Sequence, residues 1–508
     1  MPTDVKQAEQ AEQAESADGS GTVLPWEERW PDHVGAGQWT GLRGALRDLP
    51  PGLTPGWRRV LVGLVVVQLV VIAVLATMVA FEFKIFSPVD EEAHFSYVQQ
   101  IAQHGTLPVL GKTPTSPQAL AVEEGTYPRP ATRTYSLTQL QGLSYEALQP
   151  PLYYIAAVPA FDLTSNYVDK VYSLRLFDVV LLLATLVCLG RLARVVLQQR
   201  WMIGWAVGLV FFALPGVVVR FVTVSNLALA VPLVLLFVTE LWIGWDRHSG
   251  RRLTLAGLFL GLSILAELEQ ILLVPVFALV VVAEGVRRMR TRIPTRGPGL
   301  PRASRVPTRK VLAPLAAAVL VPIVVTAPWF LFNEANYHML TAGPIAITEQ
   351  TPTVNPHHLR YSIGQLPNDT VNFLLDPTIP EEWVGSLGGQ PALNELDLLV
   401  SALIIPGSLV MIAGLGRRLR SVRVAILGLP WVVNILELWC IRYGEQWLIA
   451  VRYTFATVPI LLVLGAGATL CALRSRILPI LVPAAATASV LIVWGFFLWS
   501  YTGTWALT

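Results

Sequence analysis

Three acidic residues and a histidine near position 90 are the first group in this sequence that could do chemistry. Asp90, Glu91, Glu92 and His94 come shortly after a 22-residue uncharged apolar run at 60–81. A carboxylate can take the proton from a hydroxyl group that attacks a substrate. Acids at a helix start also have a structural explanation, because they complement the helix dipole. Asp90 is the candidate general base, with Glu91 as second choice or as its partner.

The same segment predicts a short amphipathic helix. Pro88 and Asp90 are typical of a helix start, and Phe95 and Val98 recur at helical spacing. Asp90 and His94, four residues apart, then share one face of the helix. His94 could bind a phosphate group or a metal ion, although a single histidine at a membrane interface is often structural.

The elements that must position these residues are membrane helices. Hydrophobic residues make up 54% of the 508 residues and charged residues only 14%, against about 25% charged in a soluble domain. Repeated uncharged runs and a mean hydropathy of +0.55 predict an all-α polytopic membrane protein. A net charge of only +3 argues against a nucleic-acid partner, and the three cysteines lie in apolar runs that do not suggest a disulfide framework.

The apolar runs predict about eleven transmembrane helices. They cover residues 60–81, 172–190, 201–218, 223–244, 253–266, 270–284, 311–332, 396–416, 424–441, 448–471 and 477–500. A single helix over 253–284 would place Glu267 and Glu269 near its middle, where a charge costs roughly 2.5–3.5 kcal/mol. A hairpin that surfaces at residues 267–270 avoids that cost.

Basic residues distinguish the two sides of the membrane. Five connectors hold 21 basic residues and two acids, whereas the loop 333–395 holds seven acids and one arginine. The connectors are 191–200, 246–252, 284–310, 417–423 and 474–476. Because cytoplasmic connectors concentrate Lys and Arg, this pattern predicts a cytoplasmic N-terminus in a multi-pass protein of the cell (plasma) membrane, with the loops 82–171 and 333–395 extracytoplasmic.

The predicted organisation has four parts. Residues 1–56 read as a disordered cytoplasmic tail. Residues 57–285 form an N-terminal transmembrane module whose first extracytoplasmic loop, 82–171, would be catalytic. Residues 286–310 form a basic cytoplasmic loop, and 311–508 a C-terminal transmembrane module with the second loop, 333–395. Both extracytoplasmic loops are expected to carry short amphipathic helices.

A second group of residues follows the first in a recognisable order. The segment Gln149-Pro150-Pro151-Leu152-Tyr153 ends the first loop, and Arg175 opens the second span. Together with Asp90-Glu91 and His94, these residues resemble the GT-C class of integral membrane glycosyltransferases. The resemblance is to the relatives of protein O-mannosyltransferases and lipid A aminoarabinose transferase, which use polyprenyl-phosphate sugars.

Later segments continue the resemblance with departures. Arg452-Tyr453 is similar to the family's Gly-Arg-Tyr, although residue 451 is valine, and the family's hairpin lysine is replaced by a stretch holding Glu267 and Glu269.

The resemblance implies a GT-C-like fold and an inverting glycosyltransferase. It would move a hexosyl or pentosyl group, with mannose as the expected sugar, from a polyprenyl-phosphate donor to an extracytoplasmic acceptor. Asp90 and Glu91 would be catalytic, and Glu267 and Glu269 would line the acceptor cavity or form a solvated turn. The phosphate and donor would be bound by His94, Gln149, Tyr153, Arg175, Arg452 and Tyr453. For Arg175 and Arg452 the alternative is interfacial snorkelling.

Cofactor use and two other function classes stay open. No cofactor is certain, and a divalent cation at Asp90 and Glu91 is optional. A lipid or oligosaccharide transporter or flippase would carry polar groups along a path and show inverted repeats, but the sequence shows no repeat. A metalloprotease is suggested by Glu91-Glu92-Ala93-His94, which is neither His-Glu-x-x-His nor its inverse.

Overall fold

The computed structural model describes residues 55–83, 85–86, 91–132, 145–197, 201–213, 215–290 and 308–341, together with isolated residues between 426 and 491. Within these residues the regular structure is helical and contains no strand. The helices are α3 (Pro55–Glu82), α4 (Glu91–His104), α5 (Pro117–Glu123), η2 (Tyr145–Leu148), α6 (Leu152–Phe161), α7 (Tyr167–Leu197), α8 (Trp201–Phe212), α9 (Pro215–Val222), α10 (Leu227–Asp246), α11 (Gly250–Ala266), η4 (Leu268–Leu273), α12 (Val274–Arg290) and α13 (Thr308–Tyr337).

Five of the described segments are long and apolar enough to cross a membrane, so the chain is a multi-pass membrane protein. These segments fall on the predicted spans 60–81, 172–190, 223–244, 270–284 and 311–332, and they are Pro55–Glu82, Tyr167–Leu197, Leu227–Asp246, Leu268–Met289 and Ala313–Tyr337. The predicted span 253–266 falls on α11, and 201–218 falls on the two shorter helices α8 and α9.

The total of eleven spans stays a prediction. The four segments predicted after residue 396 lie outside the described residues, apart from isolated positions.

The predicted hairpin at 253–284 is confirmed, and two of the four residues of its turn are buried in the protein. Helix α11 ends at Ala266, Glu267 is extended, and η4 and α12 run back. The return is fixed near the end of α12, where Arg288 Nη2 donates to the carbonyl oxygen of His248 at 2.7 Å. Glu267 and Gln270 are only 3% and 2% exposed. Leu268 and Glu269 between them are partly exposed, and Gln149 of the first loop lies 3.5 Å from Glu269.

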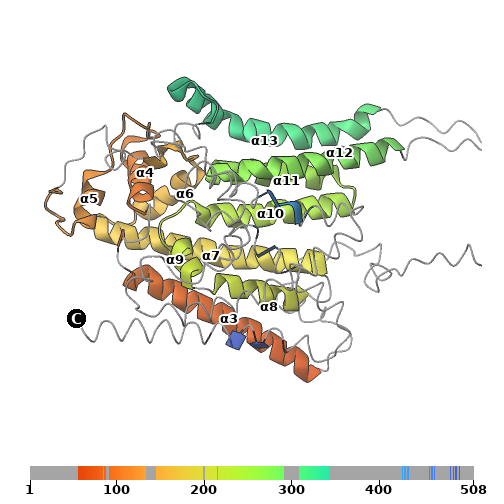
Figure 1. Ribbon diagram of the computed structural model, residues 1–508, viewed down its shortest axis with the longest axis horizontal. Helices are drawn as coiled ribbons and strands as arrows, with labels where there is room; N and C mark the ends of the chain where they lie inside the picture. The colour runs from red at the N-terminus through yellow and green to blue at the C-terminus, as the bar shows by residue number, and fades with distance from the viewer. Residues whose placement is uncertain are drawn as a thin grey trace, which may run out of the picture.

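The helices of the first loop gather at one end of the membrane helices. Figure 1 shows α4, α5 and α6 beside the same ends of α7 and α11. The predicted amphipathic helix is confirmed as α4: Phe95 and Val98 are fully buried, while Gln103 and His104 are exposed. Helix α4 packs on α6, and α6 packs on α7 and α11.

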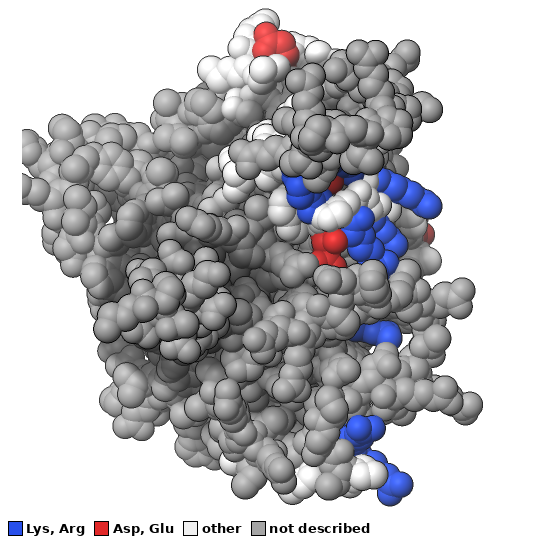
Figure 2. Space-filling view, turned by 90° about the vertical axis from the view of Figure 1, so that its right-hand side faces the viewer, with Lys and Arg blue, Asp and Glu red and all other residues white. Residues whose placement is uncertain are grey.

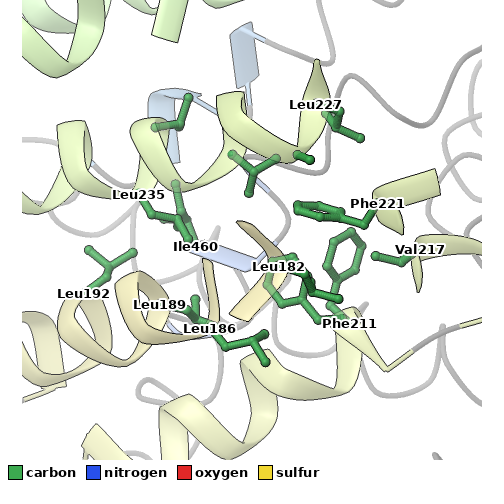
Figure 3. Close-up of a cluster of buried hydrophobic side chains, with 14 of the residues drawn as sticks. Leu182, Leu186, Leu189, Leu192, Phe211, Val217, Phe221, Leu227, Leu235 and Ile460 are labelled. Atoms are coloured by element: carbon green, nitrogen blue, oxygen red, sulfur yellow. The ribbon is translucent and has the colours of Figure 1, made fainter. Parts of the chain in front are cut away.

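An apolar core joins the helices that hold this end in place. Leu182, Leu186 and Leu189 follow one another along α7 at helical spacing and are buried. Figure 3 shows them in one cluster with Phe221 of α9 and Leu235 of α10. Because interiors pack at near-crystalline density, these contacts fix the spacing of α7, α9 and α10.

The opposite end of the bundle carries arginines, and we call it the arginine end. It includes the start of α3, the ends of α7 and α12 and the α10–α11 connector, with Arg58, Arg59, Arg191, Arg194, Arg247, Arg251, Arg252, Arg287 and Arg288. Figure 2 shows basic side chains gathered on this face. Two buried acids are neutralised here: Glu240 pairs with Arg191 and Arg252, and Glu284 pairs with Arg287 and Arg288.

Glycines let α11 lie very close to α13. A Cβ added at Gly257 would overlap the carbonyl oxygen of Ala318 and approach Pro322, and one added at Gly261 would lie 3.0 Å from the Cα of Pro322. Small residues on a helix face allow this close approach between membrane helices.

We expect Gly257→Ala to destabilise the protein by about 1–3 kcal/mol, because the added methyl group meets backbone that cannot move aside. Gly63→Ala in α3 is the matched control, since its methyl group would meet no atom within 4 Å. The measurement is the melting temperature of both purified variants in detergent. Equal melting temperatures would contradict the packing described for α11 and α13.

Candidate active site

An ion pair between Glu91 and Arg175 lies at the junction of the first loop and the membrane helices. Arg175 Nε donates to Glu91 Oε1 at 2.8 Å, and Nη2 donates to Oε2 at 2.7 Å. Both side chains are fully buried. This two-bond geometry is the strong form of an arginine–carboxylate interaction.

Backbone groups complete the hydrogen bonds of both partners. Glu91 also accepts from the N–H of Phe86 at 2.8 Å and from the N–H of Val224 at 3.2 Å. Its four acceptor positions are then filled. Arg175 Nη1 donates to the carbonyl oxygens of Ala80 and Phe83 at 3.2 and 2.7 Å. The pair thereby ties the end of α3, the start of α4, α7 and the α9–α10 connector together.

This arrangement changes the interpretation of Glu91 and Arg175. To accept a proton or hold a metal ion, Glu91 would have to give up one of its four donors. In this structure Arg175 donates hydrogen bonds to Glu91 and to two carbonyl groups. Its contact with a donor phosphate stays a prediction. Asp90, the first choice for the base, lies outside the described residues, as do Arg452 and Tyr453.

A second polar group surrounds His94. The ring nitrogen Nδ1 of His94 lies 2.8 Å from the hydroxyl oxygen of Tyr154, and that hydroxyl donates to Glu146 Oε2 at 3.3 Å. Burial, together with the Glu146 carboxylate, raises the pKa of Tyr154 well above its usual value. The phenol is therefore protonated and donates to Glu146, which makes His94 Nδ1–H the donor to Tyr154. Any contact of His94 with a donor would then use Nε2.

Tyr97 packs against the Tyr154 ring of this group. Its ring stacks on that of Tyr154 with centroids 3.7 Å apart, and its hydroxyl donates to the carbonyl oxygen of Gln149 at 3.2 Å. Burial raises the pKa of Tyr97 well above its usual value, so this hydroxyl is protonated too.

The structure brings a predicted donor residue and a predicted acceptor residue together. Gln149 Nε2 lies 3.5 Å from Glu269 Oε1, and Asn226 Nδ2 lies 3.5 Å from Gln149 Oε1. We call Gln149, Asn226 and Glu269 the amide–carboxylate group. Glu267, the other predicted acceptor residue, accepts from Gln270 Nε2 at 2.8 Å and is buried.

Tyr153, a predicted donor residue, contacts a carboxylate that the sequence analysis did not select. Its hydroxyl lies 3.0 Å from both oxygens of Asp178, and the N–H of Ser225 donates to that hydroxyl at 3.2 Å and lies 3.4 Å from Asp178 Oδ2. Asp178 is fully buried inside α7. An ionisable residue within an apolar span was the available signal, because such residues are rare in membrane helices unless they have a role.

A metal site was an option at Asp90 and Glu91. Among the described residues no group of three or more His, Cys, Asp and Glu side chains has the arrangement to hold a metal ion. Glu91 also fits poorly as a ligand, since Arg175 and two backbone N–H groups occupy its oxygens.

Comparisons with known proteins give structural neighbours only. No protein-family model and no curated protein sequence matches the chain. Among solved structures, the chain is similar to ArnT from Cupriavidus metallidurans in the apo state, with a TM-score of 0.46, 15% identity and coverage of 81% of this chain and 60% of that one. The same protein bound to undecaprenyl phosphate gives a TM-score of 0.43 at 15% identity, with the same coverage.

A second neighbour is the Archaeoglobus fulgidus oligosaccharyltransferase in complex with Zn and sulfate. Its TM-score is 0.44 at 12% identity, and the match covers 84% of this chain and 52% of that one. ArnT and the Archaeoglobus fulgidus oligosaccharyltransferase are GT-C class membrane glycosyltransferases, the class that the sequence motifs resemble. The chain spans only 52–60% of the length of these proteins, and the likeness concerns the fold alone.

We expect Glu91→Gln to destabilise the fold by about 3–5 kcal/mol, because it leaves the Arg175 guanidinium buried without its counter-charge. Melting temperature and yield in detergent are the measurements. The double variant Glu91→Gln/Arg175→Met should recover part of the loss, since it removes both charges. A Glu91→Gln protein that melts like the wild type would show that the pair does not hold these segments together.

Proposed function

We propose that the protein is an inverting glycosyltransferase that moves a sugar from a polyprenyl-phosphate donor to an acceptor outside the cytoplasm. Mannose is the sugar that the family resemblance implies. The lipid bilayer is its setting, and the lipid-linked donor and the acceptor are its partners.

One observation carries the proposal. Polar residues from distant parts of the sequence gather at the end of the bundle opposite the arginine end. They come from α4, the η2–α6 junction, α7, the α9–α10 connector and η4, and include His94, Gln149, Tyr153, Arg175 and Glu269. A transferase whose donor is anchored in lipid needs its polar site at this boundary, where the lipid tail can stay among apolar helices and the sugar can meet water-soluble groups.

The proposed reaction is a single displacement. Asp90 takes the proton of the acceptor hydroxyl as its oxygen forms a bond to the anomeric carbon. The bond between that carbon and the phosphate oxygen breaks, and the polyprenyl phosphate leaves with the electron pair. The new bond forms on the opposite face of the sugar, so the configuration inverts. Asp90 rather than Glu91 is assigned as the base, because the oxygens of Glu91 already accept four hydrogen bonds.

The leaving phosphate requires positive charge or hydrogen-bond donors nearby. His94 is proposed to serve it in the doubly protonated form, donating from Nε2–H, with its ring held by Tyr154 and Glu146. Arg452 and Tyr453 are proposed as further contacts from their place in the sequence. Glu267 and Glu269 are proposed to lie where the acceptor meets the transferred sugar.

Asp90→Asn should lower the transfer rate by about 10²–10⁴-fold, the usual contribution of a general base. Binding of polyprenyl phosphate should not weaken, because the amide has the same size and removes a negative charge together with the proton acceptor. Radiolabelled polyprenyl-phosphate mannose and purified protein give the rate. Asp169→Asn, at an exposed position in the first turn of α7, is the control. Full activity of Asp90→Asn would refute the assignment of the base.

The proposed orientation can be tested separately. In a chain whose native cysteines are replaced, single cysteines are introduced at the exposed positions His104 and Arg251. We expect an impermeant maleimide added to intact cells to label position 104 and not position 251, since the arginine end should face the cytoplasm. The opposite labelling would reverse the topology.

A further inference from the structure

Three polar side chains from separate elements meet in the amide–carboxylate group. Gln149 comes from the η2–α6 junction, Asn226 from the start of α10, and Glu269 from η4. They form a row in which Asn226 Nδ2 points to Gln149 Oε1 and Gln149 Nε2 points to Glu269 Oε1. The chain separations are 77 and 120 residues, so only the fold brings them together.

Backbone contacts hold two members of the row, Gln149 and Asn226. The carbonyl oxygen of Gln149 accepts from the Tyr97 hydroxyl, and its N–H donates to the carbonyl oxygen of Glu146 at 2.9 Å. Asn226 follows two residues whose N–H groups are bound by buried carboxylates: Val224 donates to Glu91, and Ser225 lies against Asp178. Recognition groups on fixed backbone lose little freedom when a ligand binds.

The two contacts within the row are long. Both are 3.5 Å, whereas a well-formed N–H···O bond is usually 2.7–3.2 Å. Gln149 is also partly accessible rather than fully buried. Such a row can exchange its internal contacts for shorter ones to a ligand.

The chemistry of the row suits hydroxyl groups better than phosphate. An amide offers both a donor and an acceptor, and a carboxylate offers acceptors only, which together match hydroxyl groups that donate and accept. A phosphate placed here would meet the like charge of Glu269, and no member of the row is a cation. Gln149 therefore fits the sugar part of a donor better than the phosphate part to which the sequence motif had assigned it.

We infer that Gln149, Asn226 and Glu269 form the subsite that selects the transferred sugar by the pattern of its hydroxyl groups. The inference rests on the proposed glycosyltransferase function and adds Asn226 as a specificity-determining residue. A site built to bond a hydroxyl group rejects an analogue that lacks it, because its own polar groups are then left without that partner.

The test uses purified full-length protein and the polyprenyl-phosphate sugar that the wild type transfers, made with each hydroxyl removed in turn. For at least one deoxy donor, the wild type should lose about tenfold or more in kcat/KM. That penalty should shrink to less than about twofold in Asn226→Leu or Glu269→Leu, because leucine cannot bond the missing hydroxyl. Gln100→Leu on α4, whose amide bonds only Thr106 among the described contacts, should keep the wild-type penalties.

A second measurement separates sugar recognition from phosphate binding and from a folding defect. The Kd of unglycosylated polyprenyl phosphate should stay within about twofold of wild type in the active variants, since the row would not touch the phosphate. Unchanged deoxy penalties in an active enzyme would overturn the inference and leave the proposed function standing. So would an equal loss for every donor together with weaker binding of the bare lipid phosphate. A wild-type protein that transfers no sugar from any polyprenyl phosphate would overturn both.

Discussion

The ion pair between Glu91 and Arg175 is the contact on which the arrangement of the site depends. A buried charge is costly unless it is paired and its remaining positions are hydrogen-bonded. Here Glu91 accepts four hydrogen bonds, and Arg175 donates two of those four and two more to the end of α3. The four bonds to Glu91 form only when α4, α7, the residues after α3 and the α9–α10 connector are in fixed places. The need to pair the buried charge therefore fixes the positions of these four segments.

The effect of the pair extends to the amide–carboxylate group through the α9–α10 connector. Two consecutive backbone N–H groups of this connector face two buried carboxylates, with Val224 on Glu91 and Ser225 beside Asp178. Asn226 is the next residue and begins the turn into α10. Backbone N–H groups of a packed connector need hydrogen-bond partners, so the carboxylates that bind them also fix the direction in which Asn226 leaves the connector.

Much of the helical fold could be predicted from the sequence, since apolar runs and arginine-rich connectors report directly on membrane spans. The hairpin at 253–284 followed from the cost of placing Glu267 and Glu269 inside one helix, and α4 followed from its start signals and spacing. The burial of Glu267 in the hairpin turn could not be predicted, because acids at a turn normally indicate contact with water.

The contacts between the site residues were harder to predict than which residues belong to the site. His94, Gln149, Tyr153 and Glu269 were selected, but their partners lie tens of residues away and leave no local pattern. Arg175 was expected at the membrane interface or on a phosphate, whereas it is 0% exposed and paired with a residue 84 positions earlier. Asp178 did have a local signal, as an acid in an apolar span. The roles of Asp90, Arg452 and Tyr453 remain predictions from the sequence.

The same ion pair limits where positive charge for a leaving phosphate can come from. Moving Arg175 onto a phosphate would leave Glu91 buried without its counter-charge, at a cost of several kcal/mol. In the proposed reaction the charge is then better supplied by His94, whose ring is oriented by Tyr154, and by Arg452 of the C-terminal module. The N-terminal module would provide the base and the sugar-binding groups, and the C-terminal module would provide the cation for the phosphate.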